Sequence, residues 1–223
     1  MSEKLTKIQW LASKDLVHFQ DAFEFMQNRV EEIIAGKNPQ LIWTLEHLPV
    51  YTAGVSAKDE DLLNAAEVPV FKTNRGGKYT YHAPGMKIIY LMLDLKDFFA
   101  PASPDIAKFV EFLEKWVIAV LDEYGIKGEI RKNRVGIWVE TPKGEKKIAA
   151  IGIKVKKWVT YHGIAINIDP DLRGFENIVP CGIKEFGVTS FADLKVEVKR
   201  NFDEVLKEKF FSTYLEMTKN NAN

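Results

Sequence analysis

The sequence predicts a single domain of the α/β (α+β) class, in which helices flank a mixed, largely antiparallel sheet. Three segments repeat apolar residues at helical spacing, and β-prone runs fill the chain between them. Three of these β-prone runs, between the second and third helical segments, follow one another directly. The 223 residues show no internal repeat and no linker rich in proline, glycine or serine, so we expect one domain over 1–223.

The three helical segments are expected near the start, the middle and the end of the chain. Ser13 can cap the first, and Gly36 is expected to end it. Its apolar stripe consists of Leu16, Phe19, Phe23, Met26, Val30 and Ile33. The second helix is predicted over 104–124 and the third over 198–217. Such stripes are typical of core packing rather than of binding surfaces.

The β-prone runs are shorter and rich in branched and aromatic residues, which is typical of strands. The expected strands are 41–46, 68–72, 88–95, 134–140, 147–158 and 160–168.

The bulk composition excludes several classes of protein. Thirty-one basic residues balance thirty-one acidic ones, so no overall field favours nucleic acid or an anionic membrane. A single cysteine argues against a disulfide-built secreted fold. No apolar run approaches the roughly 18 residues of a membrane span, and the first residues lack the features of a signal or transit peptide. We therefore expect a cytoplasmic protein with no membrane or nucleic-acid partner.

Cys181 is the first candidate for chemistry, because it lies between Pro180 and Gly182, which favour a bend. A free cysteine is often only a small buried hydrophobe. If Cys181 is functional, its simplest role is that of a nucleophile or a thioester carrier. A reactive thiolate needs a nearby cation or base, and Lys147 is our candidate for that group.

Lys147 has two interpretations. The residues that share its parity along the predicted strand are Ala149, Ile151, Ile153 and Val155. A regular strand would thus place Lys147 at the start of an apolar face, where a partly desolvated amine suits proton transfer. Alternatively, Lys147 is a solvated strand end beside Lys143 and Lys146. Periodicity alone leaves both open.

Small residues gather on two neighbouring β-prone runs, at Ala149, Ala150 and Gly152 and at Gly163 and Ala165. They could leave an apolar slot for a narrow, flexible chain, or let a helix pack closely, which is the commoner use. Burying seven methylenes of an acyl chain in such a slot would contribute roughly 5–6 kcal/mol.

The segment 75–82 is a glycine-bearing polar turn that could approach a ligand or form a surface hairpin. His82 and His162 could be acid–base groups, although lone histidines are more often structural. No cluster has the spacing of metal ligands, so we expect no metal. A local set of lysines could be a solvated face or a dock for an acidic protein; it comprises residues 143, 146, 147, 154, 156 and 157.

Taken together, these segments resemble the lipoyl(octanoyl) transferase family, in the same order and most strongly over 41–191. The matching segments are 45–52 (LEHLPVYT), 75–77 (RGG), 80–82 (TYH), 84–85 (PG), 134–138 (RVGIW), 147–152 (KIAAIG), 158–163 (WVTYHG), 170–172 (PDL), 178–182 (IVPCG) and 188–190 (VTS). The chain departs from the family pattern at Ala83 and Met86.

The resemblance implies the catalytic fold of biotin and lipoate protein ligases, and it implies an acyltransferase. Members transfer an octanoyl group from octanoyl-acyl carrier protein to a specific lysine of apo lipoyl domains. Such domains occur in 2-oxoacid dehydrogenase complexes and in the glycine cleavage H protein. No cofactor is implied, because the acyl group arrives on the phosphopantetheine of the carrier.

The resemblance also implies the site. Cys181 would form the acyl thioester, and Lys147 would be its catalytic partner. The segments implied to line the acyl site contain Arg75, Gly76, Gly77, Lys78, Tyr79, Thr80, Tyr81, His82, Ala150, Ile151, Gly152, Gly163, Ile164 and Ala165. The main alternative is an ATP-dependent lipoate or biotin protein ligase; a cysteine hydrolase and a non-catalytic carrier-binding module are also open.

Overall fold

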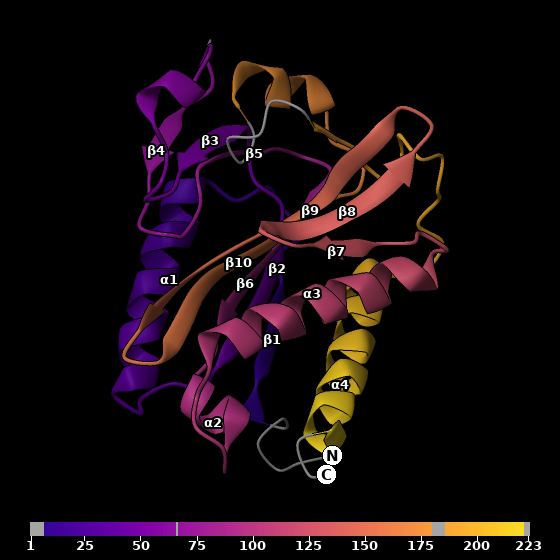
Figure 1. Cartoon of the computed structure of the whole chain (residues 1–223). Helices are drawn as coiled ribbons and strands as arrows, with labels where there is room; N and C mark the ends of the chain where they lie inside the picture. Colours follow the sequence, from indigo (N-terminus) through magenta and orange to yellow (C-terminus); the bar gives the residue numbers. More distant parts are fainter. Residues whose placement is uncertain (1–6, 66, 180–185, 221–223) are drawn as a thin grey trace.

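A mixed sheet of eight strands forms the centre of the protein (Figure 1). The structure is a computed structural model, and it describes residues 7–65, 67–179 and 186–220. The strands are β1 (Gln9–Ala12), β2 (Leu41–Leu45), β6 (Met86–Met92), β7 (Glu129–Arg131), β8 (Arg134–Thr141), β9 (Gly144–Lys156), β10 (Val159–Asn167) and β11 (Gly187–Val188). Their order is β1-β2-β6-β10-β9-β8-β7, with β11 beside β9. The pairs β1–β2 and β9–β11 are parallel and the others antiparallel, which confirms the predicted sheet.

A second, three-stranded sheet lies beside the first and has the order β4-β3-β5. Its strands are β3 (Val50–Ala53), β4 (Val70–Lys72) and β5 (Tyr79–His82). The predicted polar turn connects β4 to β5, so this small sheet holds the turn against the large one (Figure 1).

Helices cover both faces of the large sheet. Helix α1 (Phe19–Ile34) packs on β6 and β10, whereas α3 (Ile106–Glu123) packs on α4 (Phe202–Asn220) and against β8 and β9 (Figure 1). Alternate residues of β6 belong to two separate core clusters, Ile89 and Leu91 on the α3 side and Ile88 and Tyr90 on the α1 side. The sheet therefore has a buried core on each face, as helices on both sides require.

Three short helices lie between the larger elements. They are α2 (Leu95–Phe99) and the 3-10 helices at Asp59–Asp61 and Leu172–Asn177. Within the described ranges, we find no helix with the length and apolar character needed to cross a bilayer.

The first helix begins later than predicted. The backbone N–H groups of Ser13 and Val17 donate to the carbonyls of Thr44 and Glu46, both at 2.9 Å, so this stretch is bound to the edge of the sheet. The Ser13 hydroxyl does not cap a helix but accepts a hydrogen bond from the Trp43 indole at 2.9 Å. The predicted end is confirmed, because Gly36 follows the helix with φ 66°.

The other two helices occur where the periodicity predicts them. Asp105 caps α3 by accepting a hydrogen bond from the Lys108 N–H at 3.0 Å. Helix α4 begins at Phe202 rather than at 198, because the Asn201 side chain accepts hydrogen bonds from the N–H groups of the two residues after Phe202. Strands β1, β3, β7 and β11, each of four residues or fewer, were not predicted.

Candidate active site

The two small-residue segments lie side by side on adjacent strands. Ala150 of β9 pairs with Ala165 of β10, and Gly152 pairs with Gly163. A Cβ atom at Gly163 would lie 2.1 Å from the Ile89 carbonyl oxygen, so this position needs glycine. The strands thus come together with little side-chain bulk between them, as the slot interpretation requires.

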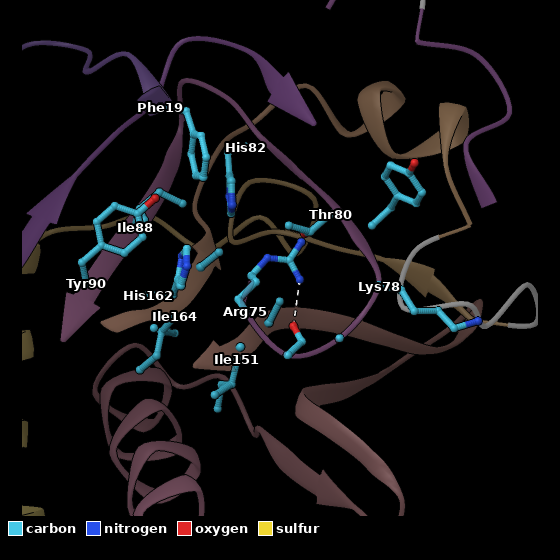
Figure 2. Close-up of a pocket in the computed structure, with 17 residues that line it drawn as sticks. Phe19, Arg75, Lys78, Thr80, His82, Ile88, Tyr90, Ile151, His162 and Ile164 are labelled. Carbon is cyan, nitrogen blue, oxygen red and sulfur yellow. Dashed lines mark hydrogen bonds between the residues drawn. The ribbon is translucent and has the colours of Figure 1, made fainter. Parts of the chain in front are cut away.

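The β4–β5 turn covers these strands and encloses a narrow cavity. The Gly76 N–H donates to the Ile153 carbonyl at 3.2 Å, which fixes the turn over β9. The cavity has a volume of about 70 Å³. It is lined by Phe19, Arg75, Gly76, Gly77, Lys78, Tyr79, Thr80, His82, Ile88, Tyr90, Ala150, Ile151, Gly152, His162, Gly163, Ile164 and Ala165 (Figure 2).

The structure therefore brings all the predicted substrate-binding residues except Tyr81 to one cavity. Tyr81 lies in the core instead, with its ring 5.2 Å from Tyr51 and 5.5 Å from Phe175. A Cβ atom at Gly174 would lie 2.2 Å from the Tyr81 ring, so glycine there makes room for it. Tyr81 is thus not part of the cavity lining, and substrate binding by the predicted residues stays a prediction.

Four cavity residues were not predicted as binding residues: Phe19, Ile88, Tyr90 and His162. Phe19 was assigned to a helical core stripe, and Ile88 and Tyr90 to a strand. His162 was weighed and judged more often structural. Periodicity finds which face of an element is buried, but it does not tell a core from the wall of a cavity.

Arg75 organises the turn. Its Nη2 donates to the carbonyl and the hydroxyl of Thr52, at 2.6 and 2.8 Å, and its Nη1 donates to the Gly76 carbonyl at 2.9 Å. Figure 2 shows its guanidinium in the middle of the cavity, near His82 and His162, while Lys78 points away. These bonds tie the turn to β3 and place a positive charge inside a mostly apolar site.

Three buried histidines, His47, His82 and His162, lie close together. Burial lowers the pKa of His47 to about 4. Burial and the nearby Arg75 cation lower the pKa of His162 to about 3. Burial, His47 and Arg75 hold the pKa of His82 well below its usual range. All three are therefore neutral at pH 7.

Hydrogen bonds fix the tautomer of His47. Its Nδ1 lies 2.7 Å from the Val17 carbonyl, which can only accept, so Nδ1 carries the proton. Its Nε2 must then accept the hydroxyl proton of Tyr90, also at 2.7 Å. Among the described residues, no group of three or more potential ligands is arranged to hold a metal ion.

Lys147 is buried, with 6% of its surface exposed. Its Nζ donates to the Val135 carbonyl at 3.0 Å and lies 4.7 Å from the centre of the Trp138 ring. The solvated strand end is therefore the wrong interpretation.

The expected strand geometry at Lys147 was wrong, however. The pairing of β8 with β9 shifts register between Ile137 and Trp138, and both Ile148 and Ala149 belong to the same core cluster. The alternation is broken there, so Lys147 does not start the apolar face but lies over Trp138.

Cys181 lies outside the described residues, and its position relative to Lys147 is not described. The nearest described residue on its C-terminal side, Phe186, contacts Trp138 edge-on at 5.5 Å. Arg134 lies over both rings, 4.5 Å from Trp138 and 4.2 Å from Phe186. Phe186 thus packs on the same indole that Lys147 contacts.

The departures from the family pattern cause no visible strain. Ala83 has no positive φ, whereas Gly85 does (φ 84°). Both Ala83 and Met86 are buried in the core cluster on the α1 side.

Solved structures with the same architecture show which class of fold this chain has. A bi-partite lipoate protein ligase from Thermoplasma acidophilum has a TM-score of 0.66 at 16% identity, covering 93% of this chain and 83% of its own. A lipoate-protein ligase A bound with ATP has a TM-score of 0.62 at 17% identity, covering 94% and 84%. The fold is that of the lipoate and biotin protein ligase catalytic domains, as predicted.

Sequence comparison narrows this class. The family described as lipoyl protein ligase A/B catalytic domain matches residues 18–211. An octanoyltransferase of Parvibaculum lavamentivorans is 49% identical over 190 residues, 83% of each chain. An octanoyltransferase of a Wolbachia species is 43% identical over 208 residues, 93% of this chain and all of its own.

The chain belongs to the lipoyl(octanoyl) transferase family and is an acyltransferase. The octanoyltransferases resemble it much more in sequence than the ligases do, so the transferase is favoured over the ATP-dependent ligase.

Proposed function

We propose that this chain transfers an octanoyl group from octanoyl-acyl carrier protein to a specific lysine of apo lipoyl domains. The acceptors are lipoyl domains of 2-oxoacid dehydrogenase complexes and the glycine cleavage H protein, and the compartment is the cytoplasm. Cys181 carries the octanoyl group as a thioester, and Lys147 is its catalytic partner.

One observation carries this proposal: a narrow, mostly apolar cavity and a buried lysine lie along the same strand. Lys147 and Ala150 are both on β9, about 10 Å apart at 3.3 Å per residue. A group held near Lys147 can therefore extend its alkyl chain along β9 and β10 into the cavity. An octanoyl group has this shape.

The chemistry proceeds in two balanced steps. The Cys181 thiolate attacks the carrier thioester, a new S–C bond forms, and the phosphopantetheine thiolate leaves and takes up a proton. The acceptor lysine amine then attacks the enzyme thioester, an amide forms, and the Cys181 thiolate leaves. Lys147, as an ammonium ion, gives the proton that the phosphopantetheine thiolate takes up in the first step. As the resulting neutral amine it accepts the proton that the acceptor amine loses in the second step, which restores the starting enzyme. Conversion of a thioester to an amide is downhill, so the reaction as written needs no ATP and no other cofactor.

The test is intact-protein mass spectrometry after mixing the protein with octanoyl-acyl carrier protein in the absence of ATP. We expect an octanoyl adduct on the native chain, discharged by apo lipoyl domain, and no adduct on Cys181→Ser. A native chain without ATP-free turnover would contradict the proposal and favour a ligase or a binding module. Release of free octanoate at a rate independent of the lipoyl domain would favour a hydrolase.

Lys147 is tested with its neighbour as a matched control. Lys147→Met removes the ammonium near Trp138, and we expect transfer to fall at least about 100-fold, within the range of general acid–base catalysis. Lys146→Met removes a neighbouring ammonium that pairs with Asp193 at 3.2 Å, and we expect less than a threefold change. Equal losses in the two variants would contradict a catalytic role for Lys147.

A further inference from the structure

The cavity has a second hollow behind it. A cleft of about 560 Å³ lies between α1 and the β9–β10 hairpin, and we call it the outer cleft. Its lining residues include Gln27, Glu31, Asn74, Lys154 and Tyr161, so it is more polar than the cavity.

The same three chain segments line both hollows. Arg75 faces the cavity and Asn74 the outer cleft; His162 faces the cavity and Tyr161 the outer cleft. Along α1, Phe19 lines the cavity, and a residue two helical turns further, Gln27, lines the outer cleft. On two of the three segments, consecutive residues therefore line the two hollows.

Four side chains fill the space between them: Phe23, Asn74, Tyr161 and His162, which we call the partition. The Asn74 amide donates to the Tyr161 hydroxyl at 2.9 Å, and its Oδ1 lies 3.4 Å from His162 Nε2. The His162 ring stacks between Tyr161, at 5.2 Å, and Phe23 of α1, at 5.6 Å. Asn74 thus joins the two rings that close the end of the cavity.

The backbone at His162 is strained to make this arrangement. His162 has φ 59° within β10, a conformation uncommon for residues other than glycine. Ile164 and Ile166, which share its parity, belong to the core on the α3 side, whereas the His162 ring contacts Phe23 and Tyr161 on the α1 side. The positive φ turns the ring to the cavity face. Strain retained within a buried strand is typical of functional positions.

The partition lies at the end of the cavity far from Lys147. Along β9 and β10, the pairs that line the cavity run from Ala150–Ala165, on the Lys147 side, through Gly152–Gly163 to the pair that contains His162. A chain that enters from Lys147 therefore meets the partition last.

We propose that the partition is the end wall of the acyl site and sets the upper limit on acyl chain length. This rests on the proposed function, since it takes the cavity as the acyl site. An octanoyl chain ends at the His162 ring, and longer chains are rejected because that ring, backed by Asn74, cannot retreat. Without the partition, the cavity opens into the outer cleft, and a longer chain can pass.

The test compares kcat/KM for dodecanoyl- and octanoyl-acyl carrier protein as donors, with the same apo lipoyl domain as acceptor. Asn74→Ala and, separately, Phe23→Ala each shorten one member of the partition outside the cavity lining. Each methylene that becomes buried is worth about fourfold in binding. We therefore expect the dodecanoyl-to-octanoyl ratio to rise at least tenfold in both variants. Gln27→Ala, which changes only the outer cleft, should leave the ratio at its native value.

The outcomes separate the two proposals. A native chain that transfers octanoyl normally, with an unchanged ratio in both variants, would overturn the end wall and leave the proposed function intact. An equal rise in the ratio for Gln27→Ala would also overturn it, because the partition would then not be the barrier. A native chain that transfers neither acyl group would contradict the proposed function itself.

Discussion

At Gly136, strand β8 passes close to Lys147. Gly136 has φ 111°, and a Cβ atom there would lie 2.6 Å from the Ala149 carbonyl oxygen and 3.4 Å from Lys147 Cε. The break in the β9 alternation and the position of the Lys147 side chain both depend on this close approach. A residue that carries no functional group therefore positions the proposed catalytic lysine.

We expect Gly136→Ala to lower both stability and octanoyl transfer. A positive φ costs about 1–3 kcal/mol for a residue with a side chain. The contact with the Ala149 carbonyl adds about 1–3 kcal/mol of overpacking and moves β9. Urea unfolding gives the stability, and transfer measured on the folded fraction gives the activity.

Gly144→Ala is the matched control, because Gly144 also has a positive φ (95°) but a Cβ atom there would meet nothing within 4 Å. It should show the backbone strain alone, with transfer near the native rate. If the two variants lost the same stability and the same activity, the close approach at Gly136 would have no role.

At the residue scale, the sequence indicated which side chains lie at the site, but not the local geometry that places them there. The pattern of glycine and alanine grouped the small residues of two adjacent strands, whereas only the family resemblance implied that the polar turn lies in the same region. Burial of Lys147 was one of two interpretations that periodicity left open, and the regular strand behind it was wrong, since a bulge is not visible in an alternating pattern. The tautomer of His47 depends on Val17 and Tyr90, which are distant in the sequence and gave no signal.

Among the elements, α3 shows how local chemistry fixes a boundary. Asp105 precedes the helix, and its carboxylate accepts the Lys108 N–H at 3.0 Å. The same carboxylate is favoured there by the positive end of the helix dipole. Asp122 lies in the last turn and is exposed, where the dipole disfavours a carboxylate.

We expect the two aspartates of α3 to respond in opposite directions. Asp105→Ala should lower the free energy of unfolding by about 1 kcal/mol, from loss of the cap. Asp122→Ala should leave it unchanged or raise it by up to about 0.5 kcal/mol. Urea unfolding at pH 7 measures both. A destabilisation by Asp122→Ala as large as that by Asp105→Ala would contradict the capping argument.

Element boundaries were predictable where a local signal fixed them and not elsewhere. The ends of α1 and α3 coincide with Gly36 and Gly125, both at positive φ. The start of α1 could not be predicted from Ser13, because the backbone just before Ser13 forms strand β1, which pairs in parallel with β2. Periodicity shows only which residues are apolar, whereas the pairing of β1 depends on β2, about 30 residues further along the chain.

On the scale of the whole molecule, the cavity depends on two sheets and a helix meeting at one place. The large sheet supplies its floor through β9 and β10, the small sheet supplies the covering turn, and α1 supplies Phe19 (Figure 1). No single element contains the site. The three buried histidines lie at this junction, so their protonation state should affect the stability of the whole fold.

We predict that the protein loses stability as the pH falls below about 6.5. The folded-state pKa values of His47 and His162, about 4 and about 3, lie below the ordinary histidine value of 6.5. Between those values the unfolded chain binds more protons, so the contribution is fully present above pH 6.5 and is lost as the pH falls. At pH 5 the loss is about 2 kcal/mol for each of the two histidines. His82 shifts in the same direction.

Urea unfolding at pH 7 and pH 5 measures this effect, with His162→Asn as the variant, since asparagine tolerates the positive φ of this position. Below pH 6.5, the free energy of unfolding of the native protein should fall as the pH falls. In His162→Asn this slope should be smaller by about 1.4 kcal/mol per pH unit, the contribution of one proton. His18→Gln, which replaces an exposed histidine outside the junction, serves as the control. A native slope that His162→Asn does not reduce would mean that His162 is not held neutral by burial, and the junction would then be open to water.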